Sequence, residues 1–382
     1  MKPVKTAIFG TGFMGRVHLE ATRRVENVEV AAIAGRNVDT ARRLGSGFSV
    51  PTATADYREV LRDPTIGAVH ICTPNAQHFP MAKDALLAGK HVLCEKPLAT
   101  SVDEGEELVA LAARQGLRNC VCHNLRCYPM VQQMRRMREA GDLGDILILQ
   151  GTYSQDWLLY DTDWNWRVET KAGGPSRCMA DIGSHWFDMA EHITGSRVTS
   201  LCADLQTFHA TRKQPKHSVE TFANKMLGPE DYIETVVDTE DFGAVIFRMG
   251  ERTRGAMTAS QVSAGRKNGL SIEIYGSKSS VAWNQERPDE LWTGLRDSGN
   301  PILIKDPSLL KPAARAYADL PGGHSEGYDD TFKQVFRRFY ASIDDARSPE
   351  YPQFTDGLRQ LKILNAELQS HQTRAWVTVP GV

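Results

Sequence analysis

Three closely spaced glycines follow the first apolar run of the chain, and they constrain its fold more than any other feature. The run "VKTAIF" (4–9) has the character of a buried strand, and Gly10, Gly12 and Gly15 stand between it and a helical pattern. In such a unit the first glycine permits a tight turn, the second lets a pyrophosphate approach the backbone, and the third lets helix and strand pack closely. The helix N-terminus adds free N–H groups. We therefore expect a dinucleotide-binding loop, with a purely structural turn as the alternative.

The choice of dinucleotide depends on the end of the second apolar run, "VEVAAIA" (28–34). A site specific for NAD normally has Asp or Glu about 20 residues past the glycines, where it binds the ribose 2′-OH. Here Gly35 occupies that place and Arg36 follows it. An arginine can pair with a 2′-phosphate, and the missing carboxylate removes a repulsion, so the sequence favours NADP over NAD. If Arg36 only begins an exposed loop, NAD would bind. Phe13 and Met14 belong to the expected cofactor-binding loop.

The first third of the chain alternates apolar runs with helical patterns. Strands are expected at 4–9, 28–34, 67–73, 90–95 and 118–123, and helices at 14–24, 38–44, 57–62, 76–87 and 102–114. Strands this apolar, separated by helices, indicate a parallel sheet that is covered on both faces. We expect residues 1–125 to form an α/β Rossmann domain.

Beyond about residue 125 strands follow one another. Strand-like runs lie at 145–155, 198–208, 232–249, 253–263, 269–277 and 280–285, and helical patterns at 129–139, 178–192, 328–343 and 355–370. Such a succession predicts an α+β domain over 126–382, built on a large, mostly antiparallel open sheet with helices on one face. The segment 301–321 is expected to be a long loop. The other face of the sheet would suit a homodimer or homotetramer contact.

Bulk properties exclude several classes of protein. The length of 382 residues suits two domains, and a formal charge of −2 gives no field that would favour nucleic acid or an anionic membrane. No apolar run approaches the roughly 18 residues of a membrane helix, and the N-terminus has no signal-peptide cleavage site. Seven cysteines, an odd number in apolar contexts, favour a reducing cytoplasm over a disulfide framework.

Metal binding is weakly indicated. The densest group of potential ligands is "CVCHNLRC" (120–127), but alternate strand residues point to opposite faces, which is poor tetrahedral geometry. Buried free thiols are the favoured interpretation. Asp188 and His192 lie on a similar side of one helix, without a third distant ligand. We expect no metal.

Five later motifs carry a family resemblance. They are "CTPNAQH" (72–78), "CEKPLA" (94–99), "NLRCYP" (124–129), "WNWR" (164–167) and "GGPSRCMADIGSHWFDMAEHITG" (173–195). In this order they resemble the Gfo/Idh/MocA family of NAD(P)-dependent sugar and cyclitol oxidoreductases. The likeness covers most of the chain, including the two-domain plan and the late helix "FTDGLRQLKILNAELQS".

The resemblance implies three catalytic residues, Lys96, Asp181 and His185. Lys96 follows the end of a strand, where open α/β sheets bind ligands, and its ammonium can stabilise an alkoxide as hydride leaves. His185 can take the hydroxyl proton, and Asp181, four residues earlier on a helix, can orient it or the substrate. The alternatives are a surface lysine in a turn and a polar pair on a helix surface.

The resemblance also implies a set of residues around the cofactor. These are Thr73, Pro74, Asn75 and His78 beneath it, Glu95 beside Lys96, and Arg126, Trp166 and Arg167 from the second domain. Asn75 could instead cap a helix. Tyr153, Trp157 and Trp164 could line a sugar cleft or pack in a core. Arg177, in a stretch that departs from the family pattern, is expected to contact a charged substrate or a neighbouring subunit.

These features predict a dehydrogenase that oxidises a hydroxyl of a sugar, glycoside or cyclitol with NADP or NAD. Hydride would pass to the nicotinamide C4, with a histidine base and a lysine that stabilises the oxyanion. Two alternatives stay open. One is a glycoside-cleaving enzyme that uses tightly bound NAD transiently, and the other is a non-catalytic dinucleotide-binding regulator.

Overall fold

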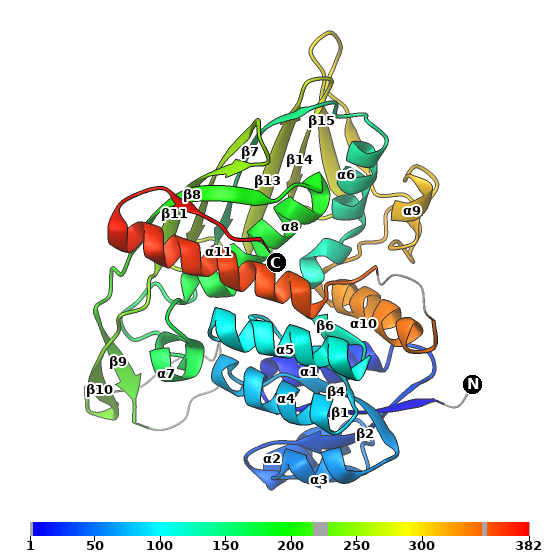
Figure 1. The fold of residues 1–382 in the computed structure, drawn as a ribbon, viewed down its shortest axis with the longest axis vertical. Coiled ribbons are helices and arrows are strands. Elements are labelled where there is room, and N and C mark those ends of the chain that lie inside the picture. Colours follow the sequence, from blue (N-terminus) through cyan, green and yellow to red (C-terminus); the bar gives the residue numbers. More distant parts are fainter. Residues whose placement is uncertain (1–2, 217–227, 346–349, 382) are drawn as a thin grey trace. The chain divides into compact units, whose positions relative to one another are not determined.

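The computed structural model describes residues 3–216, 228–345 and 350–381 of the chain, which form two compact units (Figure 1). Unit 1 comprises residues 1–124 and 329–361, with residue 382, and unit 2 comprises 125–328 and 362–381. The expectation from the sequence had placed 126–382 together, whereas the contacts group 329–361 with the N-terminal residues. Among the described residues, no helix has the length and apolar character that crossing a membrane requires.

Unit 1 is built on a six-stranded parallel sheet, which confirms the expected Rossmann fold. The strands are β1 (Val4–Phe9), β2 (Val28–Ala34), β3 (Thr52–Thr54), β4 (Ile66–Ile71), β5 (His91–Cys94) and β6 (Asn119–Val121). Their order is β3-β2-β1-β4-β5-β6, so the direction of winding reverses between β1 and β4. Ligands of open α/β sheets bind at such a switch point, beyond the carboxyl ends of the strands.

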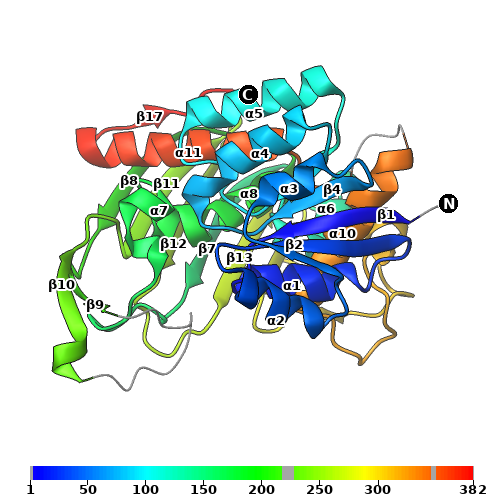
Figure 2. The same cartoon turned by 90° about the horizontal axis from the view of Figure 1, so that it is seen from below.

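Helices cover both faces of this sheet. They are α1 (Phe13–Thr22), α2 (Val38–Ser46), α3 (Tyr57–Arg62), η1 (Asn75–Gln77), α4 (His78–Leu87), α5 (Val102–Gln115) and α10 (Tyr328–Asp344), with the first part of α11 (Phe354–Thr373). Figure 2 shows α1 and α2 on one face and α3, α4 and α5 on the other. Local signals set the helix ends: Ser101 accepts from the Glu104 N–H at the start of α5, and Gly116 ends it in a left-handed conformation.

Unit 2 contains a nine-stranded sheet in the order β16-β15-β14-β13-β7-β12-β11-β8-β17. Its strands are β7 (Ile146–Ser154), β8 (Val198–Gln206), β11 (Phe242–Met249), β12 (Thr253–Ser260), β13 (Gly269–Gly276), β14 (Ser280–Asn284), β15 (Glu290–Gly294), β16 (Ile302–Ile304) and β17 (Val377–Thr378). Every neighbouring pair is antiparallel except β7 and β12, which run parallel. The expected large, mostly antiparallel sheet is confirmed. Strands β9 (Thr211–Pro215) and β10 (Tyr232–Val236) form a separate pair.

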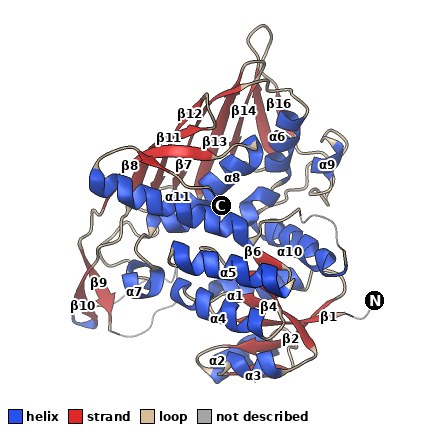
Figure 3. Cartoon of the chain, viewed as in Figure 1, coloured by secondary structure: helices blue, strands red, loops and turns tan. Residues whose placement is uncertain are grey.

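Helices of unit 2 pack on one face of the sheet (Figure 3). They are η2 (Asn124–Cys127), α6 (Pro129–Glu139), η4 (Met179–Gly183), α8 (Ser184–Thr194) and α9 (Pro312–Arg315), besides the last turns of α11. Unit 2 also contains the short helices η3 (Trp166–Val168), α7 (Thr170–Gly173) and η5 (Pro229–Asp231). Trp186 of α8 is buried against the sheet and donates from its indole N–H to the Ser271 carbonyl, 2.9 Å away. On strands of the sheet, Ile148 and Ile246 keep 48% and 50% of their surface exposed.

The expectation of a long loop at 301–321 is wrong in part. The segment contains β16, which pairs with β15 at the sheet edge, and the short helix α9. The rest is held from within, because the buried ammonium of Lys305 donates to the carbonyls of Leu320 and His324 and to the Glu326 carboxylate. Lysine is a residue type that is rarely buried, so the sequence gave no signal of this burial.

Candidate active-site residues

The glycines after β1 have three different environments. Gly10 has a φ of +117°, and a Cβ there would lie 2.5 Å from the Cys72 carbonyl oxygen. A Cβ on Gly15 would overlap with the carbonyl oxygen of Gly10, so helix α1 can cross close to the strand only because this residue is glycine. At Gly12 no described atom lies within 4 Å of such a Cβ. Gly12 therefore faces space that a ligand can enter.

Helix α1 begins at Phe13, directly after this turn, and its N-cap residue Gly12 brings no side chain to its first N–H groups. Phe13 is half exposed beside them. Backbone N–H groups at a helix N-terminus, together with the helix dipole, bind phosphate. Met14, the next residue, packs against the buried cluster of Ile8 and Leu19.

The end of β2 carries no acidic side chain at the place where an NAD-specific site often has one. A Cβ on Gly35 would lie 2.5 Å from the Thr11 methyl group, and the Gly35 N–H is bonded to the Thr54 carbonyl. Arg36 is exposed, and Asn37 caps helix α2 by accepting from two backbone N–H groups. The Arg36 guanidinium is therefore available to solvent or to a ligand.

His78 joins the loops that follow β4 and β5. Its Nδ1 lies 2.6 Å from the Pro97 carbonyl and its Nε2 lies 2.9 Å from the Thr73 carbonyl. Burial lowers the pKa of His78, which favours the neutral ring, and a neutral ring can donate to only one carbonyl at a time. The alternative role of Asn75 as a helix cap is wrong, because Pro74 is the N-cap of η1 and Gln77 that of α4. Asn75 is itself the first residue of η1.

Glu95 and Lys96 follow the carboxyl end of β5. The Glu95 carboxylate is buried, and its Oε2 accepts the backbone N–H of Lys96 at 3.3 Å. Lys96 is half-buried. Since β1 and β5 belong to one parallel sheet, the glycine turn and the lysine lie at the same edge of it.

In unit 2, Asp181 and His185 lie on one continuous helical segment. Asp181 belongs to the π-helical turn η4, and His185 is the second residue of α8. Single π-helical turns are frequent at functional sites. The Asp181 carboxylate accepts from the Gln261 amide at 2.9 Å and lies 3.4 Å from Nε of Arg167. His185 is buried, with the ring of Tyr153 6.5 Å from its own.

Gln261 is a functional candidate that the sequence did not reveal. Its side chain is fully buried, and its Oε1 accepts from Nη1 of Arg177 at 3.2 Å. A guanidinium can only donate, so this contact turns the amide nitrogen of Gln261 toward Asp181. The orientation of the Asp181 partner is thus set from the interior of unit 2.

The expectation for Arg177 is wrong. Its side chain is 0% exposed and forms an ion pair with Asp241, which also pairs with Arg212 at 2.7 Å. The Arg177 backbone N–H donates to the buried carboxylate of Glu240. A buried arginine without its acid would be costly, so Asp241 explains why this arginine is inside. Arg177 anchors the interior and does not reach solvent.

The remaining predicted residues of unit 2 also have partners there. The Arg167 guanidinium lies 4.4 Å from the centre of the Trp166 ring, so the tryptophan supports the cation that faces Asp181. Arg126 forms a bidentate ion pair with the buried Asp188: its Nε donates to Oδ2 at 2.6 Å and its Nη2 donates to Oδ1 at 2.5 Å. This pair ties the turn η2 to helix α8.

Two of the aromatic residues that were expected near a sugar, Tyr153 and Trp157, are hydrogen-bonded to polar side chains. The Tyr153 hydroxyl donates to Asn268 Oδ1 at 2.8 Å, and the Gln155 amide donates to the same oxygen at 2.8 Å. Trp157 donates from its indole nitrogen to Gln155 at 2.9 Å. Burial, with the charge of Asp181, raises the pKa of Tyr153, so this phenol stays protonated.

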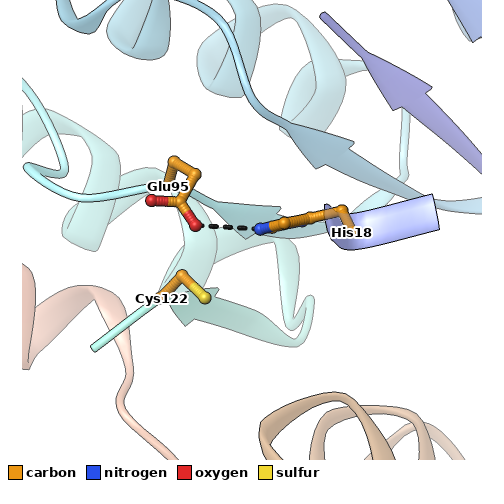
Figure 4. Close-up of side chains that lie close together, drawn as sticks. All are labelled: His18, Glu95 and Cys122. Atoms are coloured by element: carbon orange, nitrogen blue, oxygen red, sulfur yellow. Dashed lines mark hydrogen bonds and ion pairs between the residues drawn. The ribbon is translucent and has the colours of Figure 1, made fainter. Parts of the chain in front are cut away.

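Potential metal ligands meet within unit 1, whereas His192 belongs to unit 2. Within the part of the chain that the structure describes, one set of three ligand atoms lies within 4.8 Å, on His18, Glu95 and Cys122 (Figure 4). Cys122 is the single member of the 120–127 run in that set. His192 instead faces Gln132 at 2.9 Å, and burial and nearby arginines lower its pKa.

The expected site residues thus fall into two groups. Unit 1 holds Gly10, Gly12, Phe13, Met14, Gly15, Arg36, Thr73, Pro74, Asn75, His78, Glu95 and Lys96, and unit 2 holds Arg126, Trp166, Arg167, Asp181 and His185. Within unit 2 the structure brings Trp166, Arg167 and Asp181 together. A shared site for Lys96 and His185 involves both units and stays a prediction.

Two family models match most of the chain. Residues 4–123 match a model described as an oxidoreductase family with an NAD-binding Rossmann fold, and residues 131–282 match a GFO/IDH/MocA C-terminal domain. Levoglucosan dehydrogenase of Pseudarthrobacter phenanthrenivorans is 28% identical, over 100% of both chains. Glucose-6-phosphate 3-dehydrogenase of Bacillus subtilis is 24% identical, over 99% of both.

Solved structures give the same result. An oxidoreductase domain protein from Kribbella flavida superimposes with a TM-score of 0.89 at 29% identity, covering 100% of both chains. Levoglucosan dehydrogenase in complex with NADH and levoglucosan superimposes with a TM-score of 0.88 at 28% identity, covering 99% of this chain and 100% of the other.

Proposed function

Because the chain belongs to the GFO/IDH/MocA oxidoreductase family, with its NAD-binding Rossmann fold, we propose that it oxidises a hydroxyl group of a sugar, glycoside or cyclitol. The observation that carries the proposal is the edge of the unit 1 sheet. There Gly12, beside open space, follows strand β1, and Lys96 follows strand β5 of the same parallel sheet. The names of the relatives, levoglucosan dehydrogenase and glucose-6-phosphate 3-dehydrogenase, support a carbohydrate as the substrate class.

The proposed reaction removes a hydride from the carbinol carbon and a proton from its oxygen. The bound nicotinamide dinucleotide supplies the hydride acceptor. Lys96 donates to the substrate oxygen and stabilises the negative charge that grows on it. His185 takes the hydroxyl proton. Asp181 orients the base or the substrate, and its contacts to Arg167 and Gln261 hold the carboxylate in place.

NAD is the dinucleotide that the family description names. The finer proposal, a preference for NADP, is supported by the exposed Arg36 and by the glycine that stands at position 35 in place of an acidic residue. Arg36→Ala should then weaken NADP binding by about 1.5–3 kcal/mol, the value of a hydrogen bond to a charged group, and leave NAD binding unchanged. Titration of protein fluorescence with each dinucleotide measures this. Equal effects on both dinucleotides would remove the proposed preference.

The catalytic proposal is tested with a panel of sugars, anhydrosugars, sugar phosphates and cyclitols, each with NAD and with NADP. Formation of reduced nicotinamide is followed by absorbance. We expect net reduction with at least one class, and Lys96→Ala should lower kcat by about 100-fold or more while cofactor binding persists. Lys83→Ala is the matched control, since Lys83 is a half-exposed lysine of unit 1 paired with Glu107. A Lys96→Ala enzyme with full activity would contradict the mechanism.

Two further proposals concern the setting of the enzyme. All seven cysteines are free thiols, which fits a reducing compartment, and we place the protein in the cytoplasm. The exposed isoleucines Ile148 and Ile246 lie on the strands of the large sheet and suit a contact with a second copy. A homodimer or homotetramer is therefore proposed, and light scattering of the purified protein tests it.

A further inference from the structure

Four polar side chains form a buried chain of contacts in unit 1 that the proposed reaction does not use directly. The Tyr340 hydroxyl lies 2.7 Å from Nε2 of His70, and Nδ1 of His70 lies 3.0 Å from Nδ1 of His18. Nε2 of His18 lies 2.8 Å from the Glu95 carboxylate (Figure 4). We call Tyr340, His70 and His18 the relay. Its members come from α10, β4 and α1, and both imidazoles are 0% exposed.

The contacts determine where each proton lies when both rings are neutral and Glu95 is ionised. The carboxylate needs a donor, so His18 carries its proton on Nε2 and presents a lone pair at Nδ1. His70 must then donate from Nδ1, which leaves a lone pair at its Nε2. That lone pair accepts the hydrogen of the Tyr340 hydroxyl. Each contact then has one donor and one acceptor, and every hydrogen bond is donated in the direction from Tyr340 to Glu95.

The charge of Glu95 is supported from several sides. Besides His18, its carboxylate accepts from the Cys122 thiol and from the backbone N–H of Lys96, and the Lys96 ammonium lies near enough to stabilise the charge. These contacts lower the pKa of Glu95 in spite of its burial. Burial lowers the pKa of His70, which favours the neutral ring that the relay requires.

A metal ion is the competing explanation for the cluster of His18, Glu95 and Cys122. Two ligand atoms on one tetrahedral zinc, each bound at about 2.0–2.1 Å, are roughly 3.3 Å apart. The His18–Glu95 distance of 2.8 Å is that of a direct hydrogen bond. A metal site would also need the thiolate of Cys122, whereas here the Cys122 thiol donates a hydrogen bond to the Glu95 carboxylate.

We propose that the relay fixes the orientation of the Glu95 carboxylate, and through it the backbone of Lys96, so that its members are positioning residues for the dehydrogenase. The inference rests on the proposed function. Two histidines and a phenol in a Rossmann core are expensive to bury, and apolar residues of similar size would pack there without needing partners. Their directed connection to the loop of the proposed catalytic lysine accounts for that cost.

The first test is the tautomeric state of the two rings, read by ¹⁵N NMR of protein labelled at its histidines. The expected result near pH 7.5 is a proton on Nε2 of His18 and on Nδ1 of His70. Variants in which each histidine is replaced by glutamine assign the signals. A doubly protonated His18, or a proton on its Nδ1, would reverse the direction of the relay and overturn the proposal. This measurement needs no substrate, so its result is independent of whether the dehydrogenase activity is found.

The second test removes one hydroxyl. Tyr340→Phe removes the donor to Nε2 of His70, so the ¹⁵N signal of that nitrogen should shift toward that of a free lone pair while the proton stays on Nδ1, and kcat should fall about three- to tenfold with less than a twofold change in KM for the cofactor. Tyr351→Phe is the matched control, because Tyr351 is equally buried in unit 1 at 5% exposure and its hydroxyl bonds only to Ser342 among the contacts described. That control should leave the ¹⁵N signals of both histidines and kcat unchanged. Equal kcat in the two variants, or an unchanged ¹⁵N signal of His70 Nε2 in Tyr340→Phe, would contradict the proposal.

The third test addresses the metal. Cobalt(II) added to the metal-free protein should give no thiolate-to-cobalt absorption. A stoichiometric absorption band that disappears in Cys122→Ser would overturn the relay and assign the cluster to a metal ion. If Tyr340→Phe fails to fold, the wild-type tautomers and the cobalt titration still decide the question.

Discussion

Substitution of Gly12, the second glycine of the loop after β1, should affect ligand binding far more than folding. In Gly12→Ala the new methyl group meets no described atom within 4 Å, and the residue has a φ of −80°, which alanine adopts readily. The expected cost in stability is only that of a poorer N-cap, about 0.5–1 kcal/mol. The methyl group would, however, occupy the space assigned to the pyrophosphate. We expect the Kd for NAD to rise at least tenfold, which corresponds to about 1.4 kcal/mol.

Gly15→Ala is the matched substitution and should behave in the opposite way. Its Cβ would overlap with the Gly10 carbonyl oxygen, a backbone atom that cannot move without shifting the strand or the helix. Overpacking of this kind costs about 2–3 kcal/mol, or roughly 5–10 °C in melting temperature. Calorimetry of binding and thermal melts of both variants give the comparison. If Gly12→Ala binds both NAD and NADP as tightly as the wild type, the assignment of the loop to a dinucleotide is wrong.

Two further predictions concern the interior of unit 2. Gln261→Leu removes the amide that donates to Asp181, so kcat should fall about tenfold or more, the value of a lost hydrogen bond to a charged group, with no further loss in an Asp181→Asn background. Gln150→Leu, which removes an amide that donates to an exposed carboxylate of the same sheet, should leave kcat unchanged, and equal losses would contradict the role of Gln261. Burial and the charge of Glu240 raise the pKa of Glu367 well above its usual value. As the pH rises above about 4.5 the unfolded chain releases this proton while the folded protein keeps it, so the group makes the fold less stable with increasing pH. Glu367→Gln should therefore gain stability relative to the wild type between pH 5 and pH 7 in urea unfolding, and an identical difference at both pH values would refute the assignment.

Local patterns were sufficient for the layers of the fold. The apolar runs of unit 1 became strands of a parallel sheet, and helices α3 and α6 have the bounds that their periodicity indicated. The strands that the sequence missed are short or polar. Strand β3 is only "TAT", and β9 reads "TRKQP", so neither carries the apolar signal on which strand prediction depends.

Other features depended on partners far along the chain. Arginine is usually an exposed residue type, and Arg177 is buried because Asp241, 64 positions later, neutralises its charge. Gln261 is 80 positions from the carboxylate that it orients, and a single glutamine gives no motif. Tyr340 is 270 positions from the His70 ring that it contacts, on a helix that the contacts group with unit 1.

The amino-acid sequence by itself determined the glycine turn, the alternation of strands and helices, and the motifs that identify the family, because these depend on backbone conformation and on periodicity over a few residues. Only the tertiary structure decided which polar groups go inside and which face each partner meets. A buried charge or imidazole is tolerated where its counterpart is folded against it, and no local pattern in the chain records that pairing.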